Sequence, residues 1–384
     1  MKQKRILFNI SEDWFFLSHF LSRALNAKKS GFEIYVCCNE TNKRKIIESH
    51  GIKFIKHPYR RSNINPIYEI YILIRLLFVI KKTKPDLIHN IALKPIIHGS
   101  FAARLLNFRT VINAPVGMGY VFSSNNLKAK LLKPIVLFLL RIFLDSNNGK
   151  NKRGKVIFEN NDDLKYFKLL KAVDSRHTCV ISGAGVEIDK AFSKKKRNNK
   201  IPKVILIARM LKDKGVYEFY EAFQLLKNKK IKCQFVLVGD VDPLNPASLK
   251  RSTLKKWKDE NLIQWLGWID DIKKVLLETD ILCLPSYREG LPKSLVEGAA
   301  AGIPLIATDT VGCREVVIDG YNGFLVPIKD SEKLAAAIEK LIMDSSLRKL
   351  MGRESFKMAS EKFSSTKINS LTLKVYNELC LKNS

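Results

Sequence analysis

Two glutamates stand eight positions apart, Glu289 and Glu297, in a segment whose pattern predicts a strand, a glycine turn and the start of a helix. The apolar run 281–284 predicts the strand, and Pro292 suits the first helical position, where a missing N–H costs nothing. Helical side chains lean toward the N-terminus, so Glu297 is expected to point at the same crevice that Glu289 borders. Carboxylates accept hydrogen bonds from hydroxyl groups, and the backbone N–H groups at a helix start bind phosphate. Together they can hold a ligand that carries both groups.

The simplest alternative makes Glu289 a solvated loop residue and Glu297 a solvated position on a helix. The neighbours of Glu297 argue against it, because Leu295-Val296 precede it and a run of small residues, 298–301, follows it. Burying an unpaired carboxylate is costly. Glu297 is therefore expected to have a partner or a ligand.

This segment resembles the E-x7-E signature of the family-4 retaining glycosyltransferases, which have the GT-B fold of two facing Rossmann-like domains. The resemblance covers most of residues 200–330 and is closest to the bacterial branch that builds lipid-linked surface polysaccharides or protein glycans. Further matching segments are 303–309, 312–315, 322–327, and Gly239-Asp240 followed by Asn245-Pro246. The N-terminal half matches this family less closely.

The resemblance implies a site for a nucleotide sugar, with UDP as the expected nucleotide. Arg209 and Lys214 match the pair that grips the diphosphate and, with Glu289 at the donor sugar, are the expected catalytic residues. Glu297 is expected to accept hydrogen bonds from the ribose hydroxyls. The other expected donor-binding residues are Gly290, Leu291, Lys293 and Ser294 at the helix start, and Trp268 and Ile269 in the loop against which the base would lie. Two alternatives stay open, namely a chance Arg-Lys pair among 67 basic residues and Trp268 as an ordinary packing aromatic.

No metal and no cofactor are expected. Asp240-Val241-Asp242 has the form of the D-x-D metal motif of the other main glycosyltransferase fold, but Asp242 precedes Pro243, and this pair typically opens a turn. GT-B enzymes do not normally require a metal. None of the six histidines pairs at the spacing of a zinc site.

The N-terminal half departs from the family pattern at two places. The segment 9–14 is predicted to be a loop, and it lacks the glycines that many relatives carry after the first strand, so it is expected to approach the ligand through side chains. The segment 113–117 lacks the histidine that many members place near the reacting sugar. The expected close-approach loop for the acceptor is Gly117, Met118 and Gly119.

Short apolar runs alternate with longer helical patterns along the whole chain, which predicts an α/β protein with parallel sheets. The predicted strands are 6–10, 33–37, 87–88, 110–113, 156–158, 203–207, 235–238, 263–265, 281–284 and 304–307. Its 384 residues are too many for one ordinary core, so two domains are expected. The predicted division is an N-terminal acceptor-binding Rossmann-like domain at 1–192, a linker at 193–200, and a C-terminal nucleotide-sugar-binding Rossmann-like domain at 201–355. A helical segment at 356–384 is expected to cross back to the N-terminal domain.

Charge is distributed unevenly between the halves. Residues 1–200 contain 38 Lys and Arg against 14 Asp and Glu, whereas residues 201–384 contain 29 against 23. This asymmetry points to an anionic partner, with membrane surface, nucleic acid and a phosphorylated acceptor as candidates. Basic residues flank two apolar runs, 67–80 and 131–144, and this pattern suits a helix that lies in a membrane interface. For 67–80 a buried crossover helix is the preferred interpretation, whereas for 131–144 the two interpretations fit equally well.

The function predicted from these features is transfer of a hexosamine or hexose from a UDP-sugar to a lipid-diphosphate-linked sugar. The seven cysteines follow no disulfide or zinc pattern, which favours a reducing cytoplasm. The enzyme is expected to lie at the inner face of the cell membrane. No nucleic-acid partner is expected. One alternative is a GT-B sugar-nucleotide epimerase or hydrolase, which needs no lipid. Another is a non-catalytic polyanion-binding protein on a GT-B scaffold, with salt-sensitive binding.

Overall fold

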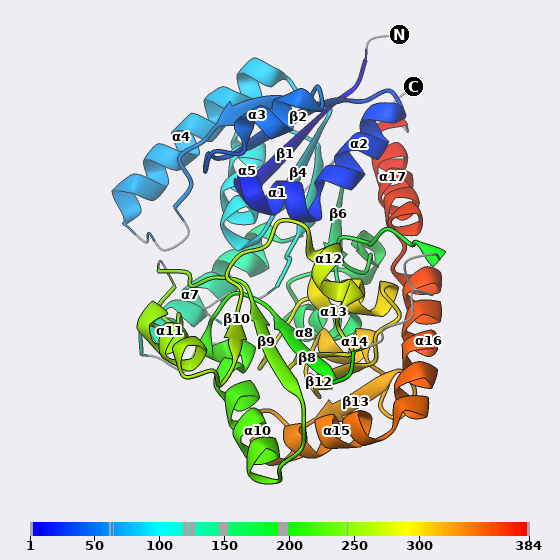
Figure 1. Cartoon of the computed structure of the whole chain (residues 1–384). Helices are drawn as coiled ribbons and strands as arrows, with labels where there is room; N and C mark the ends of the chain where they lie inside the picture. The colour runs from blue at the N-terminus through cyan, green and yellow to red at the C-terminus, as the bar shows by residue number, and fades with distance from the viewer. Residues whose placement is uncertain are drawn as a thin grey trace. The chain divides into compact units, whose positions relative to one another are not determined.

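Two parallel β-sheets, each covered by helices, organise the chain (Figure 1). The computed structural model describes residues 3–60, 63, 65–117, 122, 127–145, 153–190, 199–243 and 245–381. The chain divides into two compact units. The first unit comprises residues 1–185 and 365–384, and the second comprises residues 186–364.

The first unit contains a seven-stranded sheet in the order β3-β2-β1-β4-β5-β6-β7. Every strand pair in it is parallel. The strands are β1 (Arg5–Glu12), β2 (Glu33–Asn39), β3 (Lys53–Lys56), β4 (Leu87–Ile91), β5 (Thr110–Ala114), β6 (Arg153–Phe158) and β7 (Thr178–Val180). Because β1 and β4 are neighbours although two strands separate them in sequence, the chain reverses its direction of winding between them, and open α/β sheets bind ligands beyond the carboxyl ends of strands at such a point.

Helices cover both faces of this first sheet, and the strands are apolar on both sides as a result. Ile6 and Phe8 of β1 belong to a core with α2 and α17, whereas Leu7 belongs to a core with Leu76 and Ile80 of α4. The helices of the unit are α1 (Asp13–His19), α2 (Leu21–Lys29), α3 (Arg44–Ser49), α4 (Pro66–Thr83), α5 (Leu93–Leu105), α7 (Leu127–Phe143), α8 (Asn161–Leu169), the 3-10 turn η1 (Ser175–His177) and the C-terminal α17 (Ser365–Leu381).

The second unit contains a six-stranded parallel sheet in the order β10-β9-β8-β11-β12-β13. Its strands are β8 (Lys203–Ile207), β9 (Gln234–Val238), β10 (Gln264–Trp265), β11 (Ile281–Leu284), β12 (Leu305–Thr308) and β13 (Gly323–Val326). Its helices are α10 (Val216–Asn228), α11 (Arg251–Asp259), α12 (Ile272–Leu277), α13 (Lys293–Ala300), α14 (Cys313–Val316), α15 (Ser331–Met343) and α16 (Ser345–Lys362), with the 3-10 turn η2 (Lys212–Lys214). Here the winding reverses between β8 and β11.

The C-terminal helix α17 belongs to the first unit, as the sequence predicted for a helix that crosses back. The Tyr376 hydroxyl of α17 lies 2.9 Å from Nδ1 of His89 in the middle of β4, and both side chains are buried. The helical segment predicted from residue 356 is two helices, because α16 ends at Lys362 within the second unit.

The structural boundary between the units falls at residues 185 and 186, ahead of the predicted linker at 193–200. Val186 already belongs to the second unit because its N–H donates to the carbonyl of Phe363 and it forms a parallel bridge with Ser364. Residues 191–198, which include most of that linker, lie outside the described residues.

Two expectations for the first unit need correction. The segment 9–14 is no loop, because β1 continues to Glu12 and α1 begins at Asp13. The helix α4 is the predicted crossover between β3 and β4, yet it is buried on one side only, and its outward side exposes large apolar residues. No helix among the described residues is both long and apolar enough to cross a bilayer.

Candidate active site

Four of the predicted site residues lie around the point where the winding of the second sheet reverses. Arg209 and Lys214 follow β8, whereas Glu289 follows the neighbouring strand β11 and Glu297 lies in α13, the next helix. The carboxyl ends of adjacent parallel strands meet at one edge, so this strand order brings together residues that 75 positions of sequence separate.

Lys214 and Glu289 form an ion pair, with Nζ of the lysine 2.5 Å from Oε1 of the glutamate. Both side chains are largely shielded, with exposed fractions of 16% and 13%. Backbone contacts hold the two segments together, because the N–H of Tyr287 donates to the carbonyl of Asp213 at 2.9 Å and Ser286 Oγ donates to the same oxygen at 3.1 Å. The carboxylate therefore fixes the ammonium group at the edge of the sheet.

Two glycines allow the backbone segments of this edge to approach closely. A Cβ on Gly215 would lie 2.1 Å from the carbonyl oxygen of Pro285, and one on Gly312 would lie 2.4 Å from that of Gly290. Both have positive φ, +71° and +80°, which side chains rarely tolerate. The N–H of Glu289 also donates to the carbonyl of Val311 at 3.1 Å. Glu289 thus stands on a backbone held from two sides.

Arg209 is held by Asp242, with its guanidinium 2.7 Å from Oδ2. The Asp242-Pro243 pair predicted a turn and gave no sign of this contact, although Arg209 and Asp242 follow adjacent strands, β8 and β9. Asp240, the other carboxylate of the D-x-D sequence, accepts two hydrogen bonds of 2.7 Å from Arg251. No cluster of three His, Cys, Asp or Glu side chains suited to a metal ion occurs within the part of the chain that the structure describes.

The helix α13 begins at Lys293, with Pro292 as its N-cap residue and not at its first helical position. Glu297, one turn into the helix, pairs with Lys293, so two residues predicted to bind the donor contact each other. This pair satisfies the expectation that Glu297 needs a partner. Leu291 is buried in the core of the unit, which leaves its backbone as the part that can meet a ligand.

The predicted base-binding loop follows β10 at the same edge. The N–H of Gly239 donates to the carbonyl of Gly267 at 2.7 Å, which ties this loop to the end of β9. Trp268 is 64% exposed and its indole N–H donates to Asp270 at 3.0 Å, whereas Ile269 packs against the core. The two predicted side chains therefore point to different surroundings.

Cys313 stands at the start of α14, within the matching segment 312–315, and the charges of both Glu289 and Lys214 act on its thiol. Burial and the negative charge of Glu289 raise the pKa of the Cys313 thiol far above its usual range. A neutral thiol is a weak nucleophile. Cys313 is therefore a packing residue at this site.

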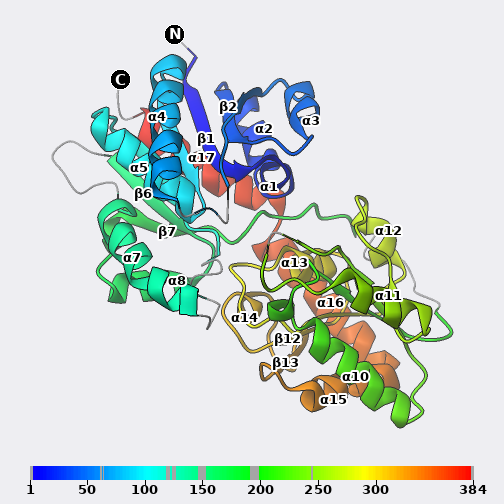
Figure 2. The ribbon, with the colours of Figure 1, turned by 90° about the vertical axis from the view of Figure 1, so that its left-hand side faces the viewer.

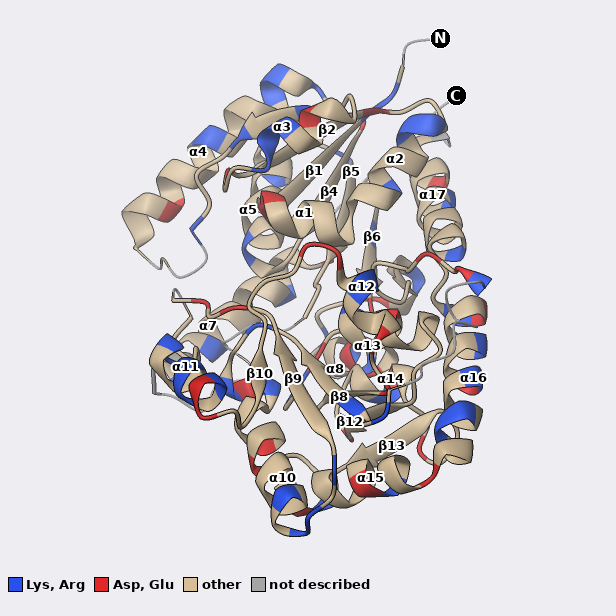
Figure 3. Cartoon of the chain, in the orientation of Figure 1, with Lys and Arg blue, Asp and Glu red and all other residues tan. Residues whose placement is uncertain are grey.

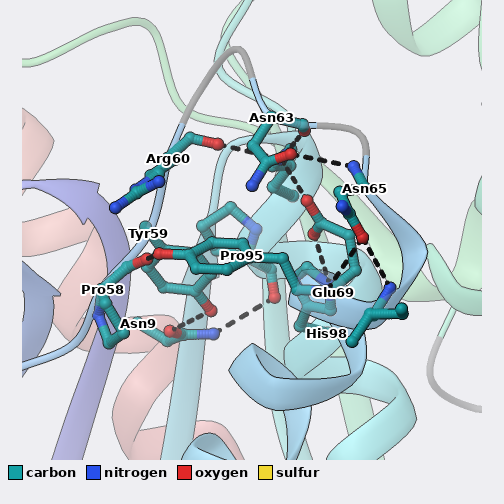
Figure 4. A network of polar contacts seen from close by, with 12 residues as sticks. Asn9, Pro58, Tyr59, Arg60, Asn63, Asn65, Glu69, Pro95 and His98 are labelled. Atoms are coloured by element: carbon teal, nitrogen blue, oxygen red, sulfur yellow. Dashed lines mark hydrogen bonds and ion pairs between the residues drawn. The ribbon is translucent and has the colours of Figure 1, made fainter.

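In the first unit, the predicted acceptor loop is described only at Gly117, which follows β5 and has a φ of +66°. Met118 and Gly119 lie outside the described residues. Just before this loop, three buried asparagines bridge the central strands: Asn9 donates to Asn90 at 2.8 Å, and Asn90 donates to Asn113 at 2.9 Å. Tyr59 donates to Asn9 from the other side (Figure 4). Asn9 thus points into the interior and not toward a ligand.

Two family models match the chain, and each falls within one unit. Residues 187–358 match the family described as Glycosyl transferases group 1, and residues 5–145 match the family described as Glycosyl transferase 4-like.

Two relatives match over most of their length. An N,N'-diacetylbacillosaminyl-diphospho-undecaprenol alpha-1,3-N-acetylgalactosaminyltransferase of Campylobacter jejuni is 29% identical over 338 residues, 85% of each chain. A UDP-Gal:alpha-D-GlcNAc-diphosphoundecaprenol alpha-1,3-galactosyltransferase of Escherichia coli is 27% identical over 328 residues, 82% of this chain and 81% of the relative.

Solved structures agree in fold. Sucrose-phosphate synthase from Thermosynechococcus elongatus superposes with a TM-score of 0.79 at 18% identity and covers all of both chains. HepE from Anabaena, in complex with UDP, superposes with a TM-score of 0.75 at 18% identity, over 98% of this chain and all of that one. The predicted fold of two Rossmann-like domains is confirmed.

Proposed function

This chain belongs to the family-4 glycosyltransferases of the GT-B fold, and from that membership we propose that it transfers a hexosamine or hexose from a UDP-sugar to a lipid-diphosphate-linked sugar, with retention of configuration. The observation that carries the proposal is the Lys214–Glu289 pair at the winding reversal of the second sheet, with Arg209 on the same strand connection. Relatives in C. jejuni and E. coli whose names specify undecaprenol-diphosphate-linked sugars support the acceptor class.

The second unit binds the donor in this proposal. Breaking the glycosidic bond develops negative charge on the diphosphate, and Arg209 and Lys214 neutralise it. The partial positive charge at the start of α13 adds to their effect. Because arginine and lysine supply this charge, the reaction needs no metal and no other cofactor.

The two glutamates have separate roles. Glu289 orients the ammonium group of Lys214 and contacts the donor sugar, whereas Glu297 accepts hydrogen bonds from the ribose hydroxyls. Charge-assisted bonds of this kind contribute about 1.5–3 kcal/mol each. The acceptor hydroxyl attacks the face that the diphosphate leaves, and a diphosphate oxygen takes its proton, so no side chain forms a covalent intermediate. The nucleobase lies against the loop at Gly267, Trp268 and Ile269.

The first unit binds the acceptor in this proposal, with the loop at Gly117 close to the reacting sugar. The excess of Lys and Arg in residues 1–200 suits an acceptor that carries a diphosphate. The enzyme works in the cytoplasm at the inner face of the cell membrane, where it extends a glycan on its lipid carrier.

The test is transfer of label from a panel of UDP-sugars into organic-extractable lipid, with purified protein and membranes of the source cell. Glu297→Gln is assayed beside the wild type, because it keeps the size of the side chain and removes its charge. We expect one donor to label the lipid and the variant to lose most of that label. Release of free sugar without labelled lipid would indicate a hydrolase, and no reaction with any donor would refute the proposal.

A further inference from the structure

Three neighbouring helices of the first unit expose apolar side chains on their outward side. The helices α4, α5 and α7 form one layer on one face of the sheet, with α5 packed against both of the others (Figure 2). Together they carry ten of the 21 large hydrophobic residues that are exposed in the described part of the chain. The remaining eleven are scattered over many elements. Large exposed apolar side chains that gather on neighbouring helices mark an interaction site.

The helix α4 shows the pattern most clearly. Ile72, Leu76 and Ile80 recur every four residues and are buried against the sheet. The opposite side would be polar in an ordinary crossover helix. Here that side carries large apolar residues with exposed fractions from 44% to 79%: Ile67, Ile70, Tyr71, Ile74 and Phe78.

The outward side of α7 repeats this arrangement. Leu131, Ile135 and Phe138 follow helical spacing and are 73%, 56% and 61% exposed. Phe101 and Leu105 of α5 are exposed as well. The ten residues on these three helices are called the apolar surface below.

The exposed charges that α4 and α7 carry are of one sign. The exposed charged side chains of α4 and α7 are all basic in the described residues: Arg75, Lys81, Lys82, Lys130, Lys133 and Arg141. In Figure 3, α4 is coloured blue at places along its length and red near one end. The single acidic residue of α4, Glu69, lies in the first turn of that helix. Its carboxylate is only partly exposed and is bound by Lys94 at 2.7 Å and His98 at 3.1 Å (Figure 4). Among the described residues, α4 and α7 therefore present no free negative charge on their outward side.

We propose that the apolar surface docks on an anionic lipid bilayer, with the side chains of α4 and α7 at the level of the headgroups. An amphipathic helix that combines large apolar residues with Lys and Arg is suited to this interface. A second copy of this chain would bring the same basic side chains against each other, so the charges argue against a dimer through this surface.

The docking adds a membrane partner to the proposed function. Its role in sugar transfer rests on that proposed function. Along the chain α4 follows β3 and α5 follows β4, so the first turns of both helices lie on the side of the sheet where the carboxyl ends of parallel strands bind ligands. A bilayer seated along α4 would lie beside this edge. A sugar on a membrane lipid would then reach the first unit without leaving its bilayer.

The test is sedimentation of the purified full-length protein with vesicles of phosphatidylcholine alone and of equal parts phosphatidylcholine and phosphatidylglycerol. We expect binding to the anionic vesicles that weakens as salt is added, and far less binding to the neutral ones. Ile70→Glu with Phe78→Glu should lower the partition coefficient at least about tenfold, because two inserted side chains are lost and two negative charges appear. Met343→Glu, a 73% exposed position in α15 of the second unit, should bind as the wild type does.

UDP binding is measured for each variant to separate the docking from the proposed function. The Ile70/Phe78 changes lie in the first unit and the Met343 change lies on α15, so both variants should bind UDP as the wild type does. Equal sedimentation of wild type and the Ile70/Phe78 variant, or no sedimentation with anionic vesicles, would overturn the docking even if sugar transfer is found. Sedimentation without any transfer would leave the docking in place and refute the activity. A wild-type dimer that the double variant dissociates, without lipid binding, would assign the surface to a second copy instead.

Discussion

The ammonium group of Lys214 and the carboxylate of Glu289 define the candidate site at the scale of single residues. Their shielded ion pair at 2.5 Å positions a cation beside the edge at which the sheet reverses its winding. Partly buried pairs of this kind are screened less by salt than surface pairs are. Removing either partner would leave the other charge without compensation. A substitution of Lys214 or Glu289 is therefore expected to change both ligand binding and the local structure.

His57 is a second residue whose surroundings lead to a prediction. Its ring is stacked on Tyr59 at 4.4 Å between ring centroids, and neither ring nitrogen has a hydrogen-bond partner among the described residues. Burial lowers the pKa of His57 to about 3, well below the value of about 6.5 expected in the unfolded chain. As the pH falls below about 6.5, the unfolded chain gains a proton that the folded protein does not bind, so stability decreases with falling pH.

We therefore expect His57→Phe to be tolerated at pH 7 and to lessen the loss of stability in acid. Between pH 7 and pH 5 the wild type should lose about 2 kcal/mol more of its unfolding free energy than the variant, at about 1.4 kcal/mol for each pH unit below about 6.5. Urea unfolding at both pH values measures this. His89, whose pKa burial also lowers to about 3, stays in both proteins, so some acid sensitivity should remain. Parallel losses in the two proteins would contradict the prediction.

At the scale of elements, the connections after β8, β11 and β12 determine where the site residues stand. Gly312 is the point where the connection after β12 meets the Glu289 segment, because a Cβ there would lie 2.4 Å from the carbonyl oxygen of Gly290 and 2.7 Å from that of Glu289. Gly320 provides a matched control, since its φ of +72° is similar and a Cβ there would meet nothing within 4 Å.

Gly312→Ala should lower sugar transfer strongly, because the segment that carries Glu289 has to move to admit the methyl group. Gly320→Ala should keep the activity and lose only about 1–2 kcal/mol of stability, which is the cost of a side chain at positive φ. The two variants are compared by kcat/KM for transfer and by urea unfolding. Equal activities would show that the position of the Glu289 segment is not critical.

Sequence patterns predicted the elements that carry the candidate site better than those at the periphery. The central strands were recognised because strands buried on both faces are almost continuously apolar, as at Lys203–Ile207 and Ile281–Leu284. The strands β3, β7 and β13 were missed, and all three lie at a sheet edge, where short, partly exposed strands carry a weaker apolar pattern.

Contacts between distant segments could not be predicted in the same way. The pairing of Arg209 with Asp242 depends on the order of β8 and β9 in the sheet, which a single sequence does not reveal. The inward position of Asn9 depends on Asn90 and Tyr59, which reach it from other strands and loops. The outward side of α4 was predicted to be buried, but it is exposed. Composition alone does not separate the two cases, because a helix can be apolar on all sides whether or not its outward side is covered.

At the scale of the whole molecule, two α/β units divide the work in the proposed reaction, and positive charge comes from side chains. The carboxylates of the D-x-D sequence are bound to Arg251 and Arg209, which leaves them poorly suited to a cation. We expect transfer to continue unchanged after treatment with EDTA and dialysis. A loss of activity that Mg²⁺ or Mn²⁺ restores would contradict a reaction driven by Arg209 and Lys214 alone.

The proposed role of Lys214 at the diphosphate is tested most directly by calorimetric titration of UDP into the wild type, Lys214→Ala and Lys229→Ala. Lys229 is the matched control, because it also pairs with a glutamate, Glu339 at 2.6 Å, but on the exposed surface of the second unit. If Lys214 binds the diphosphate, UDP binds the wild type and Lys229→Ala alike and binds Lys214→Ala at least about tenfold more weakly, because one charge-assisted contact is lost. Equal UDP affinity in all three proteins, or no UDP binding by the wild type, would contradict it.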